Sequence, residues 1–360
     1  VYKRQIMLRR VANPHSSQAR GLVSNLAAGS EQGPRGRQAV WRRPMTNHFE
    51  ASAFGGPGWS PRTTALRQEI GQVWGRCGIN DEWSPLKAVL LHRPGSEVEQ
   101  TADADAAQML GTLSVRRAQE QHDALAQAFR DSGIAVRYVE PPDEAPPNLM
   151  FLADLLFMTP EGAVLGRPAS EVRAGEERLV AVRLAELGIP ILRSVRGGGT
   201  FEGADAAWIG PDTVLLATGL RTNRDGADQV AHLLHEMGVH VVRIGLPYGA
   251  MHLMGQLRFA DHDLAFAWPG RVPFAAVESL REMGYNVLFL PDEHEAACGM
   301  SLNFVTMGPR RILMASGNPV TQAFFEAAGV DCHTVPADEL AKAAGGIGCL
   351  TGVLERGSRA

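Results

Sequence analysis

The sequence predicts an α/β fold of five similar units, arranged as a pseudo-symmetric five-unit α/β propeller. From Leu86 onward the chain repeats a short apolar strand, a polar turn, an amphipathic helix, and a glycine that precedes another strand. The glycines of the five repeats are Gly133, Gly188, Gly238, Gly284 and Gly329, spaced 55, 50, 46 and 45 residues apart. Such a period is typical of repeat architectures, in which each unit buries its apolar face against its neighbours.

Each repeat carries one helix with apolar residues at helical spacing. The helices are predicted at residues 117–132, 171–187, 272–283 and 320–328, and a fifth begins after Thr222 and runs to Met237. The glycine that follows each helix accepts the left-handed conformation that ends a helix. After Gly238, residues 239–244 alternate between apolar and polar positions, as a half-buried strand does.

A doubly wound α/β sheet also alternates strands with helices and is the alternative fold class. The glycine spacing runs through all five repeats, and no glycine-rich phosphate loop follows the first strand. These two observations favour the propeller, whose centre would be ringed by strand ends and the loops that follow them.

The composition restricts the class of partner. With a formal net charge of −4 and no apolar run of about 20 residues, neither nucleic acid nor a membrane is expected as a partner. Four widely spaced cysteines (Cys77, Cys298, Cys332 and Cys349) without a C-x-x-C pair favour reduced thiols in the cytoplasm and no metal site. No cofactor is expected, and the oligomeric state is left open, a homodimer included.

The N-terminal segment differs from the rest of the chain. Residues 1–44 carry nine Lys and Arg side chains against a single acid, Glu31. A transit peptide has this composition, but residues 1–5 also resemble a translated sequencing adaptor, which is the favoured interpretation. We therefore expect residues 1–75 to be a disordered or artefactual extension, with Met45 as a natural start, and residues 76–360 to form a single catalytic domain.

Three segments contain side chains suited to covalent or acid–base chemistry. Cys349 follows a run of four residues that includes three glycines, which expose a thiol and allow a ligand to approach the backbone. Glu202 and Asp205 lie three residues apart, so that one can hold a histidine while the other anchors a turn. His252 stands alone in an apolar segment, where an imidazole without a role is costly. Taken singly, a packed cysteine, a solvated acidic turn and a satisfied core histidine are the alternatives.

Charged side chains elsewhere suit the binding of a polar ligand. Asp154 ends an apolar segment, where a carboxylate needs a cation or several hydrogen bonds, and a guanidinium supplies both. Arg167, Arg173 and Arg221 follow strands. Most such arginines are solvated, but a pair of them can bind a carboxylate bidentately.

Together these segments resemble the guanidino-group-modifying superfamily, which includes arginine deiminases, dimethylarginine dimethylaminohydrolases and amidinotransferases. The matching motifs are Asn-x-x-Phe-x-x-Asp at 148–154, Glu-Gly-x-Asp at 202–205, Arg-Thr-Asn at 221–223, His-Leu at 252–253 and Gly-Gly-x-x-Cys-x-Thr at 345–351. They occur in the order of the family, and the resemblance covers residues 85–356. It implies the five-unit α/β propeller known as the pentein fold.

The resemblance also implies a role for each residue. Cys349 would be the nucleophile that forms a covalent S-amidino intermediate, His252 the general acid and base, and Glu202 the carboxylate that orients the histidine. Asp154 would bind the guanidinium of the substrate, and Arg221 and Arg173 would bind its α-carboxylate. Asn303 would be a further substrate-binding residue, and Asp205 would be structural. Residues 101–115 are expected to form a loop that closes over the site.

One departure from the family narrows the substrate class. Met254 stands two residues after His252, where arginine deiminases and amidinotransferases generally carry an Asp. Dimethylarginine dimethylaminohydrolases also lack that Asp, since an alkylated nitrogen needs apolar room rather than a carboxylate. Ala153 stands where deiminases usually carry a charged residue, and residues 297–303 resemble the corresponding segment of dimethylarginine dimethylaminohydrolases. Both observations favour such a hydrolase. The expected function is hydrolysis of arginine or an N-methylated arginine at a guanidino C–N bond, with amidinotransferase or arginine deiminase as alternatives and a non-catalytic propeller binding protein as the alternative of another class.

Overall fold

The computed structural model describes residues 48–99 and 103–357. Contacts divide the chain into two units, residues 1–62 and 63–360. The described part of the first unit contains two single-turn 3-10 helices, η1 (His48–Glu50) and η2 (Ser52–Phe54). Residues 1–44 and the start expected at Met45 lie outside the described residues, and the domain boundary at residue 75 stays a prediction.

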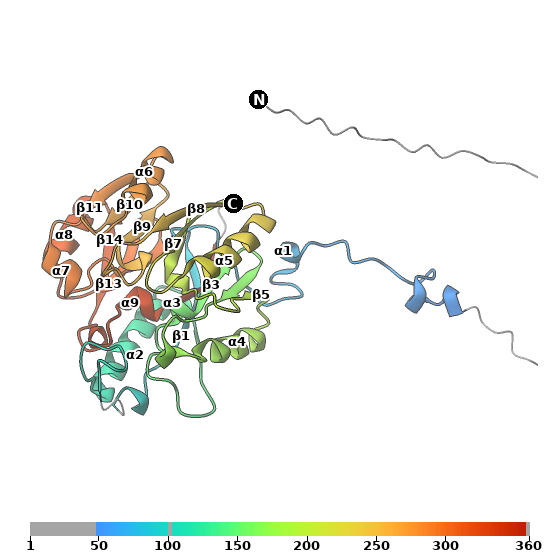
Figure 1. The fold of residues 1–360 in the computed structure, drawn as a ribbon, viewed down its shortest axis with the longest axis horizontal. Helices are drawn as coiled ribbons and strands as arrows, with labels where there is room; N and C mark the ends of the chain where they lie inside the picture. Colours follow the sequence, from blue (N-terminus) through green and yellow to red (C-terminus); the bar gives the residue numbers. More distant parts are fainter. Residues whose placement is uncertain (1–47, 100–102, 358–360) are drawn as a thin grey trace, which may run out of the picture. The chain divides into compact units, whose positions relative to one another are not determined.

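The described part of the second unit contains five three-stranded sheets that share one topology (Figure 1). The first strand of each sheet is antiparallel to the middle strand, and a helix connects the middle strand to a parallel third strand. In this order the sheets are β15 (Gly352–Arg356), β1 (Leu86–Leu91) and β2 (Ala135–Tyr138); β3 (Leu156–Thr159), β4 (Gly162–Leu165) and β5 (Ile191–Ser194); β6 (Ala206–Gly210), β7 (Thr213–Thr218) and β8 (His240–Gly245); β9 (Leu257–Asp261), β10 (Leu264–Ala267) and β11 (Asn286–Phe289); and β12 (Val305–Gly308), β13 (Arg311–Ala315) and β14 (Asp331–Val335). The sequence repeat predicted only the middle and third strands, so the antiparallel first strand is an addition.

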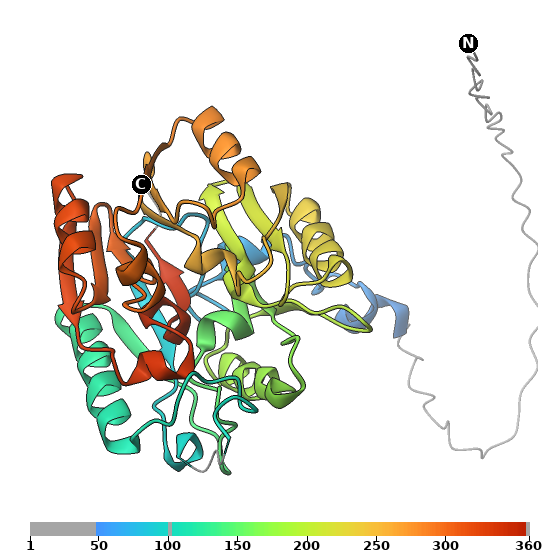
Figure 2. The same ribbon diagram turned by 60° about the vertical axis from the view of Figure 1, so that its left-hand side comes forward.

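The helices of the second unit are of two kinds. Those that connect parallel strands are α2 (Val115–Asp131), α4 (Glu176–Glu186), α5 (Arg224–Glu236), α6 (Phe274–Glu282) and α8 (Pro319–Ala327), and they lie outside the strands (Figure 2). The shorter ones are α1 (Leu66–Glu69), α3 (Leu152–Leu155), α7 (Glu293–Ala297) and α9 (Ile347–Leu350), with the 3-10 turns η3 (Ser96–Val98), η4 (Glu171–Arg173), η5 (Gly203–Asp205), η6 (Leu253–Gly255) and η7 (Leu340–Ala343). None of the helices among the described residues combines the length and the apolar character needed to cross a membrane.

The five glycines of the repeat end their helices as predicted. Their φ angles lie between +69° and +90°, the left-handed region that glycine adopts without strain. In each case the residue after the glycine donates its backbone N–H to a carbonyl five residues earlier, as Val239 does to Leu234. This Schellman arrangement satisfies carbonyls that the end of the helix leaves free.

One predicted helix begins too early. The sequence placed a helix over residues 171–187, but the structure has η4, a break at Gly175 with φ +93°, and then α4. The left-handed glycine separates the two helical segments, because a continuous helix requires φ near −63°. The break leaves Arg173 at the end of η4, from which its side chain reaches the acidic residues of the site.

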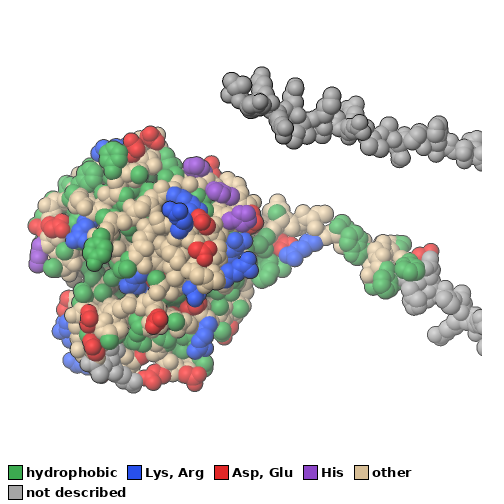
Figure 3. All heavy atoms as spheres, viewed as in Figure 1, with side chains coloured by type: hydrophobic (Ala, Val, Ile, Leu, Met, Phe, Trp, Pro, Cys, Tyr) green, Lys and Arg blue, Asp and Glu red, His purple; other side chains and the backbone are tan. Residues whose placement is uncertain are grey.

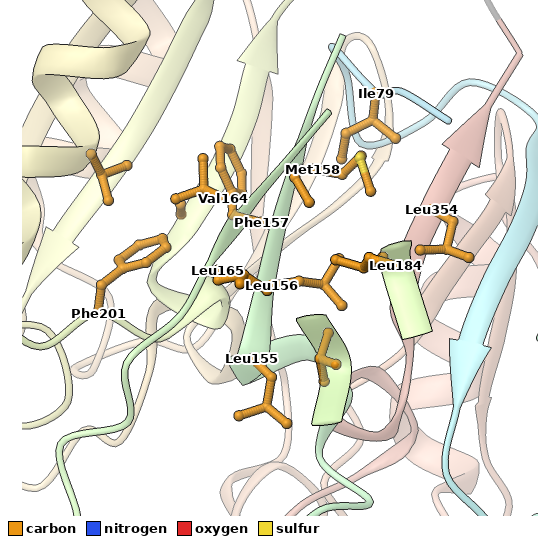
Figure 4. Close-up of a cluster of buried hydrophobic side chains, with 14 of the residues drawn as sticks. Ile79, Leu155, Leu156, Phe157, Met158, Val164, Leu165, Leu184, Phe201 and Leu354 are labelled. Atoms are coloured by element: carbon orange, nitrogen blue, oxygen red, sulfur yellow. The ribbon is translucent and has the colours of Figure 1, made fainter. Parts of the chain in front are cut away.

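The core lies between the sheets and their helices. The middle strands are almost wholly buried, as in β4 and β10, whereas the third strands alternate between exposed and partly buried positions. Figure 4 shows one cluster, in which Leu156 and Leu184 lie near Leu354 of β15. On the face shown in Figure 3, acidic and basic side chains are interspersed. The predicted absence of a nucleic-acid partner stays a prediction.

The first strands of all five sheets line one internal cavity of about 50 Å³. They contribute Val353, Leu156, Ala206, Arg258 and Val305, from β15, β3, β6, β9 and β12 respectively. Five small sheets around a shared cavity fit the predicted propeller.

Candidate active site

Five of the predicted site residues lie at equivalent places in the five units. Each is in or beside the short segment that leads into the first strand of a sheet: Asp154 before β3, Glu202 before β6, His252 before β9, Asn303 before β12 and Cys349 before β15. The repeat therefore brings residues that are as much as 195 positions apart to one end of the five first strands.

Cys349 lies in α9, so the segment predicted as an exposed loop is a short buried helix. Asn303 makes two hydrogen bonds with the cysteine. Its Nδ2 donates to the Cys349 Sγ at 3.0 Å, and its Oδ1 accepts from the Cys349 backbone N–H at 3.0 Å. The glycines before the cysteine allow this approach, because a Cβ on Gly346 would lie 2.9 Å from the Cβ of Asn303. Asn303 thus positions the thiol. The sequence had predicted that Asn303 contacts the substrate.

His252 and Glu202 form a buried pair. The Nε2 atom of His252 lies 2.6 Å from Oε2 of Glu202, and both side chains are at most 4 % exposed. The Ala169 backbone N–H donates to Oε1 of the same carboxylate at 3.1 Å. These contacts fix the plane of the imidazole, as expected for a histidine that exchanges protons.

Charges around the pair shift the pKa values of both groups. Burial alone would lower the pKa of His252, but the charge of Asp154 and the hydrogen bond with Glu202 raise it to about 9. Burial would likewise raise the pKa of Glu202, yet the hydrogen bond and charge of His252, together with Arg173 and Arg221, lower it to about 2. At neutral pH the pair is therefore an imidazolium bound to a carboxylate.

Arg173 is the cation at the centre of the acidic residues. Its Nη1 lies 2.6 Å from Oδ2 of Asp154 and 3.6 Å from Oε2 of Glu202, and its Nη2 lies 2.9 Å from Glu176. Arg173 is 3 % exposed, and it donates hydrogen bonds from Nη1 to Asp154, from Nε to Glu176 and from Nη2 to the Phe151 carbonyl. Asp154, Glu202 and His252 also offer atoms within 4.8 Å of one another, as a metal site requires, but Arg173 already compensates both carboxylates.

Asp154 keeps one carboxylate oxygen free of hydrogen bonds. Its Oδ2 is bonded to Arg173, whereas the buried Oδ1 has no hydrogen-bond partner among the described residues. The Nε2 atom of the His252 ring lies 3.7 Å from Oδ1. A buried carboxylate oxygen without a partner is costly, so this atom is ready to accept from a ligand.

The thiol of Cys349 is held in its neutral form. Burial and the charge of Asp154 raise its pKa to about 11, against the opposing hydrogen bonds of Asn303 and Gly346 and the charge of Arg258. A cation that neutralised Asp154 would remove one of the two causes that disfavour the thiolate.

Arg221 and Asp205 both lie close to the pair of His252 and Glu202. Arg221 lies in the same cavity as Asp154, with Nη1 3.5 Å from Oε1 of Glu202, and its side chain is 10 % exposed. Asp205 is fully buried and accepts from the Leu253 backbone N–H at 3.1 Å, next to His252. Burial raises the pKa of Asp205 to about 6. The structural role expected for Asp205 stays a prediction.

Two cavities meet at Cys349 and His252. The first, of about 20 Å³, is lined by Asp154, Arg173 and Arg221. The second, of about 120 Å³, is lined by the same two residues together with Gln256, Trp268 and Leu302. Met254 lines neither of them: it lines the internal cavity together with Arg258. Met254 packs near Gly348, the residue before Cys349, because a Cβ on Gly348 would lie 3.3 Å from its Sδ, and the apolar room expected for the substrate at Met254 stays a prediction.

Sequence reasoning missed several residues of the site. Glu176 holds Arg173, and Asn148 donates to the Ala107 carbonyl at 2.8 Å. That bond anchors the described part of the loop expected over the site, and Gln108 of this loop lines the first cavity. Asn148 stood in a recognised motif, but Gln108 has no sequence signal. Of the three arginines predicted after strands, Arg167 lines neither cavity.

Comparisons with known proteins show which proteins this chain is similar to. The family model for arginine deiminase matches residues 275–356. The chain is 26% identical over 244 residues to an N(G),N(G)-dimethylarginine dimethylaminohydrolase of Pseudomonas aeruginosa, a match that covers 67% of this chain and 90% of the relative. A second such hydrolase, from Streptomyces coelicolor, is 29% identical over 232 residues, covering 64% of this chain and 84% of the relative.

The fold is also similar to solved structures. A dimethylarginine dimethylaminohydrolase in an adduct with 4-chloro-2-hydroxymethylpyridine has a TM-score of 0.63 at 24% sequence identity. The match covers 76% of this chain and 100% of that chain. At this identity the likeness concerns the fold.

Proposed function

Because this chain belongs to the guanidino-group-modifying superfamily, we propose that it is a cysteine-dependent hydrolase of arginine or an N-methylated arginine. The reaction would replace one guanidino nitrogen by oxygen, through a covalent S-amidino intermediate on Cys349. Two relatives are named as dimethylarginine dimethylaminohydrolases, which supports the methylated substrate.

The observation that carries this proposal is the free carboxylate oxygen of Asp154. The Oδ1 atom of Asp154 is buried, lacks a hydrogen-bond partner among the described residues, and lines a cavity with Cys349 and His252. A guanidinium N–H would satisfy that oxygen and bring the guanidino carbon beside the thiol. Arg221, which lines the same cavity, would then bind the α-carboxylate of the amino-acid part.

Arg173 has a different role in this proposal from the one the sequence suggested. Its donors are committed to Asp154, Glu176 and Glu202. It would hold these carboxylates in place, while Arg221 provides the main contact to the substrate carboxylate. Direct contact of Arg173 with the substrate would require one of these ion pairs to open.

The first half of the reaction follows from the charges. The bound guanidinium would neutralise Asp154, lower the pKa of the Cys349 thiol and so promote the thiolate, the form that attacks carbon. His252, protonated at neutral pH, would donate a proton to the departing nitrogen. The tetrahedral adduct would collapse to the S-amidino intermediate.

The second half of the reaction uses the same histidine as a base. After giving up its proton, His252 would take one from water, and the resulting hydroxide would attack the amidino carbon. The thiolate then leaves, and a ureido product is released. Asn303, which donates to Sγ, would stabilise the thiolate in both halves.

Arginine deiminase is the second candidate, because the arginine deiminase family model matches residues 275–356. The two activities differ in the leaving group, which is ammonia for arginine and an alkylamine for methylated arginine. Amidino transfer to an amine remains the third candidate, since it proceeds through the same intermediate.

We also infer that the five units surround one axis. Residues from all five first strands line one cavity, and the site residues occupy equivalent places before those strands, which supports a propeller. The four cysteines are free, which supports a reducing, cytoplasmic location.

The test is mass spectrometry of the full chain incubated with arginine, monomethylarginine, asymmetric dimethylarginine and guanidinoacetate, with and without an acceptor amine. We expect a ureido product from a methylated arginine and a mass increase on Cys349 under rapid quench. The Cys349→Ala variant should show neither signal. If no substrate gives product or adduct, the hydrolase proposal is wrong.

A further inference from the structure

The second cavity at the site is larger than the first and differs in chemistry. It holds about 120 Å³ and shares Cys349 and His252 with the first cavity, but Asp154 and Arg221 do not line it. Apart from the residues shared with the first cavity, its side chains are mainly apolar: Trp268, Ala296, Ala297, Met300 and Leu302. Cavities of this size class accommodate small hydrocarbons.

Two buried amides, Gln256 and Asn303, interrupt the apolar wall, and both polar atoms of the Asn303 amide are bonded to Cys349. Gln256 is 5 % exposed, lines the cavity, and its Oε1 has no hydrogen-bond partner among the described residues. Its backbone is fixed, since its N–H donates to Leu253 and its carbonyl accepts from Trp268. A buried acceptor without a partner, in an otherwise apolar cavity, suits a ligand with one N–H group and a hydrocarbon body.

The position of the two cavities assigns that ligand a place in the reaction. With the amino-acid part of the substrate on the Arg221 side and the guanidino carbon over Cys349, a substituent on the far nitrogen points into the second cavity. His252 lies on the boundary, where the nitrogen that leaves must receive its proton.

We propose that the second cavity is the binding site for the leaving amine, and that the substrate is an arginine whose substituent is a linear alkyl group longer than methyl. This inference rests on the proposed hydrolase function and deepens it by naming the substrate class. The alkyl chain packs against Trp268, Ala296 and Leu302, and the amine N–H donates to Oε1 of Gln256.

The reaction at this site is balanced without any further reactant. The Cys349 thiolate bonds to the guanidino carbon, the bond from that carbon to the substituted nitrogen breaks, and that nitrogen takes a proton from His252. Water then supplies a hydroxyl to the carbon and a proton to the histidine. The sum is substituted guanidinium plus water to ureido product plus alkylammonium.

The test compares kcat/KM of the full chain for Nω-methyl, Nω-propyl and Nω-butyl arginine, measured as ureido product. Each methylene buried in an apolar pocket contributes roughly a threefold gain, so Nω-propyl arginine should exceed Nω-methyl arginine by about tenfold. A decline of tenfold or more from methyl to propyl would overturn the amine site while leaving the hydrolase function intact. The absence of product from every arginine derivative would instead refute the hydrolase function itself.

Two variants and one control assign the effect to this cavity. Ala297→Phe, at an exposed position of α7 that lines the cavity, should remove the propyl-over-methyl preference by filling the space. Gln256→Met, which keeps the length of the side chain but not the acceptor, should reduce kcat/KM for all three alkylated substrates. His294→Phe adds a ring on the same helix outside the cavity and should keep the wild-type preference. If Ala297→Phe retains that preference as well, the substituent lies elsewhere and the proposal fails.

An amine added from solution provides an independent check. Because amine departure is reversible, butylamine in the second cavity should capture the intermediate and convert the methylated substrate into Nω-butyl arginine. The Ala297→Phe variant should lose this product. Equal capture by both proteins would mean that amines reach the intermediate by another route, against the proposal.

Discussion

The exchange Glu202→Gln separates the charge of the site from its shape. Glutamine keeps the size of the side chain and an oxygen that can accept from His252, but it removes the negative charge 2.6 Å from Nε2. The pKa of His252 rises from 6.5 to about 9, and that of Glu202 falls from 4.5 to about 2. For each of the two groups, the pKa in the protein differs by about 2.5 from its ordinary value, which corresponds to about 3 kcal/mol.

Glu202 supplies only part of that energy, because Asp154 is the first cause that raises the pKa of His252. Burial opposes these favourable charges, so about 3 kcal/mol, equivalent to about a hundredfold in rate, gives only the order of magnitude of the effect. We expect kcat/KM at pH 8 to fall by tenfold to a hundredfold. The limb of the pH profile where His252 loses its proton should move to lower pH, since the imidazolium loses its closest anion.

The assay is the formation of ureido product as a function of pH, from about pH 6 to 10, with circular dichroism to confirm that the variant is folded. Glu186→Gln is the matched control, since Glu186 is an exposed carboxylate that pairs only with Arg183 among the described residues. The control should reproduce the wild-type profile. A Glu202→Gln rate within threefold of wild type, with an unmoved alkaline limb, would refute the role assigned to the pair.

Three further predictions follow from the same geometry. Cys349→Ala should abolish turnover and leave the melting temperature within a few degrees of wild type, as measured by product formation and thermal denaturation; near-normal turnover would exclude the thiol as nucleophile. Arg221→Ala should raise KM at least tenfold with a smaller change in kcat, because a carboxylate contact is lost; an unchanged KM in steady-state kinetics would place the substrate carboxylate elsewhere. Since the pKa of His252 is raised, its stabilising charge is complete below about pH 6.5 and is lost as pH rises through about 9, so the melting temperature should fall over that interval. In His252→Gln that fall should be smaller, and an equal fall would show that other groups cause it.

The helices and the ends of the helices could be predicted from the sequence, because the residues that specify them are neighbours in the chain. The glycine after each helix marks a left-handed residue, and all five such glycines adopt positive φ. The first strands were not predicted, since β9 and β12 are short runs without a neighbouring signal of their own. The start of α4 was misplaced because apolar spacing continues across Gly175, whose conformation breaks the helix.

The sequence predicted which residue types the candidate site contains, but not the contacts between them. Asp154, His252 and Cys349 stood out as polar or reactive residues in apolar or glycine-rich segments, and all three line one cavity. Nothing local marks Gln256, because its single relevant property, an oxygen without a partner, depends on its neighbours in space.

The sequence by itself determined the five-fold repeat, the ends of its helices and the residue types expected at the candidate site, because these depend on residues close together in the chain. Only the tertiary structure decided that Asn303 holds the thiol, that Arg173 is committed to three carboxylates, and that Met254 faces the internal cavity. Each of these outcomes depends on distances between side chains from different units. Such distances are set by how the sheets pack together, which no single repeat encodes.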